Sequence, residues 1–294
     1  MDALAYDLKN LTLKAEGSHL TRTQRHRGLQ AIARDLRGLG FALPGAASLK
    51  PKHVEALVAH WKAARLTPGT LKNRMGWVRW WAQSVRKASV LPRDNASVGI
   101  PIREGFKGSK AHTTMGQKMS ALPDRMQLAL RLQMAFGLRL EESLKFRVGQ
   151  ADHGDHIALQ ASWCKGGRSR EVALTHSRQR ALLDEVRTVC GNGAIIPQSK
   201  SYIEFRKEVE HATWRAGIHN MHGHRHWYAQ WRYRVLTGRP SPAAGGETYE
   251  RLSRGERARD YRARLQISRE LGHNRLHVTD IYLGGRFAAK GRAR

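Results

Sequence analysis

The segment His222-Gly-His-Arg225-His226 is the most informative part of this sequence. His222 and Arg225 are three residues apart, so a helix would place both side chains on one face. An arginine can hold two oxygens of a phosphate group at once, and a histidine can exchange a proton near neutral pH. The segment therefore points to chemistry on a phosphate ester.

Three further segments carry groups that suit the same chemistry. In Phe136-Gly-Leu-Arg139-Leu-Glu-Glu142, the arginine comes just after a glycine at a predicted helix junction. Lys165-Gly-Gly-Arg168 places a lysine at the tip of a predicted hairpin. Leu271-Gly-His273 is followed by Ile281-Tyr282. Each segment is weak evidence alone, but the four in this order form a specific pattern.

Cleavage of a phosphodiester without a metal ion needs a charge clamp, a proton donor and a nucleophile. Two guanidinium groups can bind the non-bridging oxygens, whose charge grows in the transition state. A lysine or histidine can protonate the departing 5′ oxygen. A tyrosine that attacks phosphorus keeps the bond energy in a phosphotyrosine ester, so no ATP is consumed. The residues that supply these parts are Arg139, Lys165, His222, Arg225, His273 and Tyr282.

The order Arg, Lys, His-x-x-Arg, His, Tyr resembles the tyrosine recombinase, or phage integrase, family. Gly137-Leu-Arg139-Leu-Glu-Glu142 is similar to the first arginine box of the family, His222-Gly-His-Arg225 to the second box and Leu271-Gly-His273 to the third. Tyr282 follows that histidine by nine residues, as the family's nucleophile does. The resemblance covers the second part of the chain closely and reaches the first part only through its helical, basic character.

The resemblance implies which residues bind the phosphate and which residue supports the site around them. Arg139 and Arg225 would bind the scissile phosphate. Glu142 would support the fold around the first arginine box.

The resemblance also implies the roles that move protons and form the covalent bond. Lys165 would be the general acid toward the 5′ oxygen, although Arg168 or Arg170 stands close enough to be confused with it. His222 would assist proton transfer from the tyrosine, and His273 would bond the phosphate. Tyr282 would form a 3′-phosphotyrosyl link.

A metal site is the alternative interpretation of the histidine-rich segment. His219, His222, His224 and His226 have spacings that suit one helix face poorly, and no cysteine lies nearby to complete a zinc site. We expect no metal and no other cofactor. His224 and His226 are expected to pack or to face DNA.

The composition favours a nucleic-acid partner. The 294 residues include 52 Lys and Arg against 24 Asp and Glu, which leaves a formal charge of +28 spread over the chain. A polyanion such as double-stranded DNA would neutralise this excess. No apolar run reaches the length of a membrane span, and the two cysteines form no disulfide framework, so a bacterial cytoplasmic location is expected.

The first hundred residues read as a helical bundle. Apolar residues recur at helical spacing around residues 29–39, 54–61 and 71–85. Basic residues crowd the same segments with few acidic residues between them, which predicts contact with the DNA backbone. The predicted DNA contacts are Arg22, Arg25, Arg27, Lys72, Arg74, Arg79 and, in the later hairpin, Arg168.

Residues 88–113 are rich in Pro, Gly, Ser and Lys, and a linker is expected at 101–113. In the second domain, 114–294, helices are predicted at Pro123–Phe136 and Arg139–Phe146. A hairpin is predicted from His156–Ala161 and Arg170–Leu174. Compared with the family, about two dozen extra residues separate Arg225 from His273, and we assign them to 237–264 as a loop and a charged helix.

The expected fold is mainly α with a small β-sheet: an N-terminal helical, SAM-like core-binding bundle and a mixed α/β catalytic domain of the tyrosine recombinase type. The expected function is site-specific cleavage and rejoining of double-stranded DNA, by a tetramer on two sites and with the two domains forming a clamp. The alternatives are a type IB topoisomerase-like enzyme and a catalytically idle DNA-binding protein of the same fold.

Overall fold

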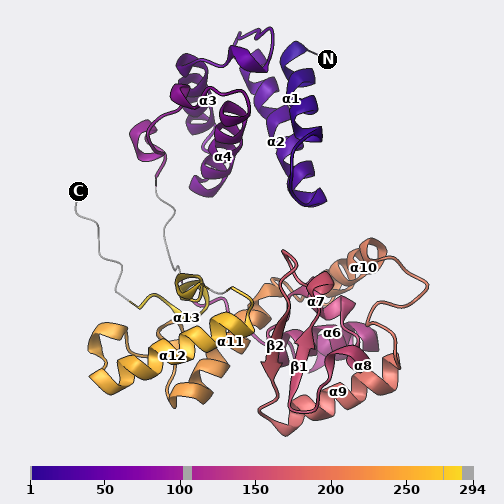
Figure 1. Cartoon of the computed structure of the whole chain (residues 1–294). Coiled ribbons are helices and arrows are strands. Elements are labelled where there is room, and N and C mark those ends of the chain that lie inside the picture. The colour runs from indigo at the N-terminus through magenta and orange to yellow at the C-terminus, as the bar shows by residue number, and fades with distance from the viewer. Residues whose placement is uncertain (1, 102–107, 274, 287–294) are drawn as a thin grey trace. The chain divides into compact units, whose positions relative to one another are not determined.

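The computed structural model describes residues 2–101, 108–273 and 275–286, and the chain divides into two compact units (Figure 1). The first unit comprises residues 1–104 and the second comprises residues 105–294. Each has its own cluster of buried hydrophobic side chains. The two units are described separately below.

The described residues of the N-terminal unit form a bundle of four α-helices. They are α1 (Ala3–Leu13), α2 (His19–Gly38), α3 (Pro51–Ala63) and α4 (Pro68–Ser84). The 3₁₀ turns of the unit are Ala46–Ser48, Ala88–Val90 and Ala96–Val98. Helix α1, which the periodicity analysis did not identify, is capped by the side chain of Asp2 and buries Leu4 and Leu8.

Local sequence explains where the other three helices of this bundle begin. Ser18 and Thr67 cap α2 and α4 through side-chain oxygens, and Pro51 and Pro68 occupy first-turn positions, where no backbone donor is required. The predicted apolar faces are buried except at their ends. Leu39 is 36% exposed, because α2 stops at Gly38.

Helices α2 and α4 approach closely at Gly28. A Cβ atom on this glycine would lie 2.3 Å from the ring of Trp77, so only a residue without a side chain fits there. Trp61 and Trp81 are fully buried, and the indole N–H of Trp81 donates to the carbonyl of Ala46 at 2.9 Å. Two of the bundle's tryptophans therefore serve its core.

The segment that follows α4 has more structure than its composition suggested. Residues 88–98 form two short turns, and Ile100 is buried in the core of the first unit. Residues 102–107, at the centre of the expected linker, lie outside the described residues. Beyond them, the backbone N–H of His112 donates to the carbonyl of Gly223 at 3.4 Å. The later part of the expected linker therefore packs within the second unit.

The second unit has nine α-helices and two strands among its described residues. The helices are α5 (Gln117–Ser120), α6 (Asp124–Phe136), α7 (Leu140–Lys145), α8 (Val148–Ala151), α9 (Ser177–Cys190), α10 (Tyr202–Arg215), α11 (His222–Thr237), α12 (Arg254–Glu270) and α13 (Asp280–Leu283). The 3₁₀ turns are Ala161–Trp163, Pro242–Ala244, Tyr249–Arg251 and Leu276–Val278. Helix α6 ends at Gly137, whose φ of +63° suits a glycine.

Strands β1 (His156–Leu159) and β2 (Arg170–Ala173) form the antiparallel hairpin that the sequence predicts, each slightly shorter than expected. Leu159 pairs with Arg170 at the end nearest the connection between the strands. Ile157, Leu159 and Val172 are buried on the inner face. The hairpin therefore covers the core beside α6 and α7 (Figure 1).

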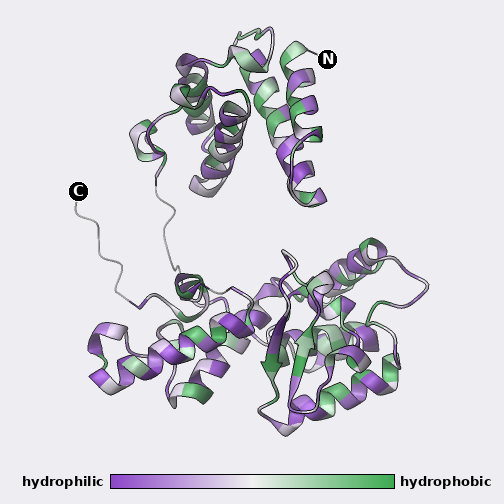
Figure 2. Cartoon of the chain, in the orientation of Figure 1, coloured by the Kyte–Doolittle hydropathy of each residue, from purple (hydrophilic) through white to green (hydrophobic). Residues whose placement is uncertain are grey.

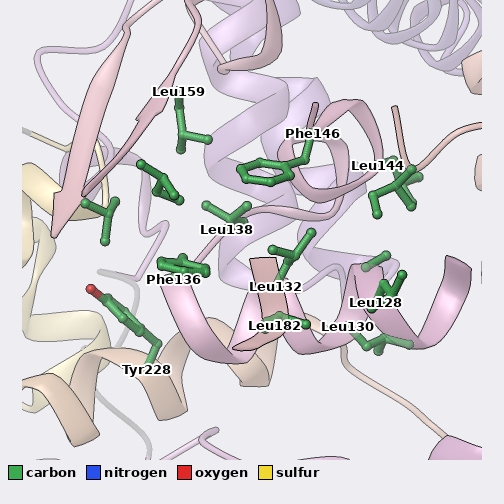
Figure 3. Close-up of a cluster of buried hydrophobic side chains, with 14 of the residues drawn as sticks. Leu128, Leu130, Leu132, Phe136, Leu138, Leu144, Phe146, Leu159, Leu182 and Tyr228 are labelled. Atoms are coloured by element: carbon green, nitrogen blue, oxygen red, sulfur yellow. The ribbon is translucent and has the colours of Figure 1, made fainter. Parts of the chain in front are cut away.

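The core of this unit is organised around α6. Leu128, Leu132 and Phe136 point from α6 toward Leu138, Phe146 and the hairpin (Figure 3). Figure 2 shows hydrophobic and hydrophilic residues alternating along the helices and strands. This packing holds the first arginine box between the hairpin and α11.

The region assigned as an insertion differs from the expected loop and helix. Helix α12 begins at Arg254 rather than near Glu247, because the side chain of Ser253 caps it and Glu256 completes a capping box. It then continues to Glu270, directly before the third box. Its buried residues face α11, so the region packs as part of the unit.

Candidate active site

The hydroxyl of Tyr282 lies at the centre of a group of basic side chains. Its oxygen is 3.2 Å from Nε2 of His273, 3.4 Å from Nε of Arg225 and 3.5 Å from Nε2 of His222. The tyrosine belongs to the short helix α13 and is 4% exposed. The name Tyr282 cluster is used below for Arg139, His222, Arg225, His273 and Tyr282.

Arg225, on α11, joins the first and third boxes. Its two terminal nitrogens donate to the carbonyls of Gly137 and Leu271, and one of them lies 3.3 Å from Nε2 of His273. The side chain is 1% exposed. Burial, followed by the charge of Arg139, lowers the pKa of Arg225 to about 10, so the guanidinium is still charged at neutral pH.

The carboxylate of Glu142 lies among three arginines. It accepts the backbone N–H of Arg139 at 2.7 Å and a guanidinium N–H of the same residue at 2.6 Å. It also accepts two hydrogen bonds from Arg170, and Arg225 is 3.9 Å away. Burial alone would raise the pKa of Glu142, but hydrogen bonds and charge from Arg170, with the charges of Arg225 and Arg139, lower it to about 2.

Arg170 has a position that the sequence analysis missed. It lies on β2, its side chain is 5% exposed, and its Nε donates to the carbonyl of Glu270 at 2.7 Å. Another nitrogen lies 3.3 Å from Sγ of Cys164. Arg170 is thus a positioning residue that links Glu142 to the end of α12. The available signal was the strand alternation, which places residue 170 on the same face as the buried Val172.

The two histidines near Tyr282 are neutral at physiological pH. Burial, then the charges of Arg225 and Arg139, lowers the pKa of His273 to about 3. The same causes lower the pKa of His222, which keeps an exposed edge. A neutral imidazole has a free lone pair and can accept the phenol proton.

Lys165 and Arg168 are not part of this group of contacts. Both side chains are exposed on the connection between β1 and β2. Within the described part of the chain, no hydrogen bond or ion pair joins either residue to the Tyr282 cluster. The structure therefore brings together five of the six predicted catalytic residues with Glu142, and it leaves Lys165 at the tip of the neighbouring hairpin.

His224 and His226 are buried on α11, as expected for packing residues. Nε2 of His224 is 2.8 Å from Oγ1 of Thr114, and the ring of His226 lies 4.5 Å from that of Tyr282. Burial lowers the pKa of each to about 4. Among the residues that the structure describes, no three His, Cys, Asp or Glu side chains are grouped to hold a metal ion.

A second charged group anchors the helix that carries Tyr282. Arg264, fully buried on α12, donates to Asp280 at 3.0 Å and to the carbonyl of Gly284 at 2.9 Å. Asp260 holds the same arginine at 3.0 Å and accepts from the hydroxyl of Tyr233 at 2.6 Å. One side chain from α12 therefore contacts both ends of α13.

Gln230 on α11 contacts the backbone of α13. Its amide nitrogen donates to the carbonyl of Tyr282 at 3.0 Å and to the hydroxyl of Ser109 at 2.8 Å. A residue of the expected linker, Ser109, is thereby connected to the residue that carries the phenol.

In the N-terminal unit, the predicted DNA contacts have different surroundings. Arg22, Arg27 and Lys72 are exposed. Arg74 forms an ion pair with Asp35 at 2.7 Å, and Asp35 also accepts the indole N–H of Trp61. This pairing engages Arg74 within its own unit, and its contact with DNA stays a prediction.

Arg25 stacks on Trp80, with its Cζ 4.4 Å from the ring. Arg79 is partly exposed.

None of the helices described is long and apolar enough to cross a membrane.

A family model described as phage integrase, N-terminal, matches residues 1–90. No curated protein sequence matches the chain. The match covers the four-helix bundle and agrees with the expected SAM-like bundle.

Solved structures with the same fold cover nearly the whole chain. The Tn1549 transposon integrase in complex with transposon right end DNA has 12% identity and a TM-score of 0.58 over 95% of this chain and 95% of that one. A λ integrase tetramer bound to a Holliday junction has 13% identity and a TM-score of 0.59 over 92% and 76%. The XerH site-specific recombinase bound to a palindromic difH substrate has 15% identity and a TM-score of 0.55 over 95% and 80%.

The chain therefore has the fold of tyrosine recombinases, a mainly helical architecture with a small β-sheet, and the predicted fold class is confirmed.

Proposed function

We propose that this protein is a site-specific DNA recombinase that cleaves and rejoins double-stranded DNA through a 3′-phosphotyrosyl bond to Tyr282. The observation that carries the proposal is the position of the Tyr282 hydroxyl, within 3.5 Å of two neutral imidazoles and one guanidinium. Such a phenol can lose its proton to a neighbour as it attacks, while the positive charge beside it stabilises the oxygen.

The phenol oxygen of Tyr282 bonds to phosphorus, and the bond from phosphorus to the 5′ oxygen breaks. The phenol proton passes to His222, whose Nε2 lies 3.5 Å from the hydroxyl, and His273 bonds the phosphate. Lys165 gives a proton to the departing 5′ oxygen. In the reverse step, a 5′ hydroxyl attacks the phosphotyrosine and releases the tyrosine.

Arg139 and Arg225 stabilise the charge on the non-bridging oxygens in this proposal. Glu142 and the carbonyls of Gly137 and Leu271 orient the two guanidiniums in advance, so that little reorganisation is needed when the phosphate binds. Lys165 reaches the phosphate from the exposed tip of the hairpin. Its place on the connection that leads into β2, whose first residue is Arg170, supports that role.

The proposed assembly is a tetramer on two DNA sites, in the bacterial cytoplasm. The fold shared with a λ integrase tetramer on a Holliday junction supports the tetramer. The two cysteines, Cys164 and Cys190, are unpaired and buried, which fits a reducing compartment.

The test uses a pool of nicked duplexes with randomised sequence, in which the fragment 3′ of the cut is lost so that cleavage cannot reverse. The protein is incubated with the pool, and covalent adducts are separated on a denaturing gel and sequenced. We expect an adduct with wild-type protein and none with Tyr282→Phe. An adduct that survives in the variant would refute Tyr282 as the nucleophile, and binding without an adduct would favour the idle DNA-binding alternative. Joining of two recovered sites, as opposed to relaxation of one supercoiled circle, separates a recombinase from a topoisomerase-like enzyme.

A further inference from the structure

The outward face of α12 carries a stripe of arginines that the proposed chemistry does not use. Arg254, Arg262 and Arg269 are exposed, and at 100° per residue they fall within about 80° of one another around the helix. Arg259 flanks the stripe, and Arg251, also exposed, lies in the turn just before the helix. The name α12 arginine face is used below for these five residues.

The acidic residues of α12 do not balance this face. Within the described chain, every carboxylate of the helix has a partner away from it. Glu256 binds the cap at Ser253 and pairs with Arg239 at 2.9 Å. Asp260 is buried against Arg264, and Glu270 is buried against Arg232 at 2.9 Å.

None of the five arginines of the α12 arginine face forms a hydrogen bond or an ion pair through its side chain with another described residue. Two exposed carboxylates, Glu247 and Glu250, lie in the loop before the helix. On a helix, opposite charges three or four residues apart can form pairs. Here Asp260 and Glu270 are buried on the inner side and Glu256 is engaged by Ser253 and Arg239, so the exposed arginines are left for a partner.

The shape of the face suits a rigid, extended polyanion. Arg254 and Arg269 are about 22 Å apart along the helix at 1.5 Å per residue, a length that corresponds to about six base pairs of duplex DNA at 3.4 Å each. Gly255 and Ala258 lie between the arginines, and a Cβ on Gly255 would have open space around it, so a bulky partner can approach the backbone. Tyr261, 48% exposed, adds a hydroxyl donor beside Arg262.

We propose that the α12 arginine face binds the phosphate backbone of duplex DNA, as a contact separate from the Tyr282 cluster. The inference rests on the proposed function in that duplex DNA is already the partner of this unit. The contact is independent of base sequence, because arginines bound to phosphates neutralise charge without contacting base edges. It also gives the region between the second and third boxes a role beyond connecting them.

The test compares two triple variants of the full chain. One variant carries Arg254→Gln, Arg262→Gln and Arg269→Gln. The control carries Arg178→Gln, Lys207→Gln and Arg215→Gln, which remove three exposed positive charges from α9 and α10. Binding to a random-sequence duplex is measured over a range of salt concentrations.

We expect the slope of log Kobs against log salt to become shallower by about 2 to 3 in the α12 variant, because each lost phosphate contact removes about 0.9. The control should change the slope by less than about one such contact. Replacing the same three arginines of α12 with lysine should restore most of the slope, because a lysine still neutralises a phosphate. An unchanged slope in the α12 variant, or an equal change in the control, overturns the proposal.

Two further measurements distinguish a DNA contact from a contact with protein, and the DNA contact from the proposed function. Sedimentation without DNA detects a protein partner: an altered oligomeric state with an unchanged salt slope would assign the face to a second copy of the chain and overturn the DNA contact. The covalent adduct assay tests the proposed function separately. If the wild-type protein forms no adduct, the proposed function fails, while the salt slopes still decide whether α12 contacts DNA.

Discussion

The guanidinium of Arg170 holds the carboxylate of Glu142 through two hydrogen bonds, of 2.9 Å and 2.6 Å, although the residues lie on different elements. The same carboxylate holds the backbone and side chain of Arg139. The position of the first predicted phosphate ligand is thus set by a residue of the hairpin.

Replacing Glu142 with Gln should destabilise the second unit. Glu142 has a folded pKa of about 2 against an ordinary value of 4.5, so its ionised form contributes about 3 kcal/mol above pH 4.5, and this is lost as the pH falls toward 2. The variant leaves three arginines around a neutral amide. Urea unfolding at neutral pH should show a loss of about 3 kcal/mol. Glu141→Gln, at an exposed neighbour paired with Lys145, is the control and should change stability by less than about 1 kcal/mol.

Arg170→Lys should slow cleavage more than it weakens DNA binding. Lysine keeps the positive charge but cannot donate two parallel hydrogen bonds to Glu142, so Arg139 loses its fixed position. We expect a cleavage rate lower by roughly 10- to 100-fold, as for other small displacements of positioned groups. Arg178→Lys, at an exposed residue of α9, is the control. Equal effects of the two substitutions on the rate would contradict a positioning role for Arg170.

Stability should fall as the pH is lowered below 6.5. In the folded protein the pKa values of His224 and His226 are about 4, whereas unfolded imidazoles take up protons near pH 6.5. The unfolded state therefore binds more protons between these values, and each histidine should remove about 2 kcal/mol by pH 5. The measurement is the free energy of unfolding against pH. A variant with His224→Gln and His226→Gln should have a flatter profile. If its profile is the same as that of the wild type, groups other than these two histidines cause the loss of stability at low pH.

Gly137→Ala should destabilise the unit strongly and displace Arg225. A Cβ at this position would lie 2.5 Å from the ring of Tyr228 and 2.9 Å from Leu271, and the backbone has a positive φ. Gly238→Ala is a matched control, because Gly238 also ends a helix at positive φ but has open space around its Cβ. The control should lose about 1 kcal/mol in thermal or urea unfolding, and Gly137→Ala at least about 3 kcal/mol. Similar losses of unfolding free energy in both variants would show that the contact of the new Cβ with Tyr228 and Leu271 is not the cause.

In the N-terminal unit, Arg74→Gln and Lys72→Gln should affect different properties. Arg74→Gln removes the partner of Asp35 and should lower the stability of the unit by roughly 1 to 3 kcal/mol. Lys72→Gln, at an exposed neighbour on α4, should leave stability unchanged and make the salt slope of DNA binding shallower by about 1. If Arg74→Gln changes the salt slope of DNA binding but leaves the stability of the unit unchanged, the predicted DNA contact of Arg74 is supported.

The sequence predicted those structural features that depend on residues close together in the chain. The end of α6 at Gly137 and the hairpin around Gly166 each depend on a glycine and on nearby periodicity. The grouping of Arg225, His273 and Tyr282 was expected from motif order and the family resemblance, and not from spacing alone.

Contacts between distant segments were not accessible in this way. Arg170 is 28 residues from Glu142 and 100 residues from Glu270, and no periodicity relates these positions. The pairing of Arg74 with Asp35 depends likewise on how α2 meets α4. The late start of α12 was readable in principle, since Ser253 and Glu256 form a capping box.

The position of α13 has a consequence for the synthesis of the protein on the ribosome. Arg139 and Arg225 precede Tyr282 in the chain, and Arg225 takes its orientation from the carbonyl of Leu271. A translation product that stops after Leu271 but before Tyr282 therefore contains both phosphate ligands and no nucleophile. On the proposed function, such a product would bind DNA without cleaving it and would compete with full-length protein for its sites.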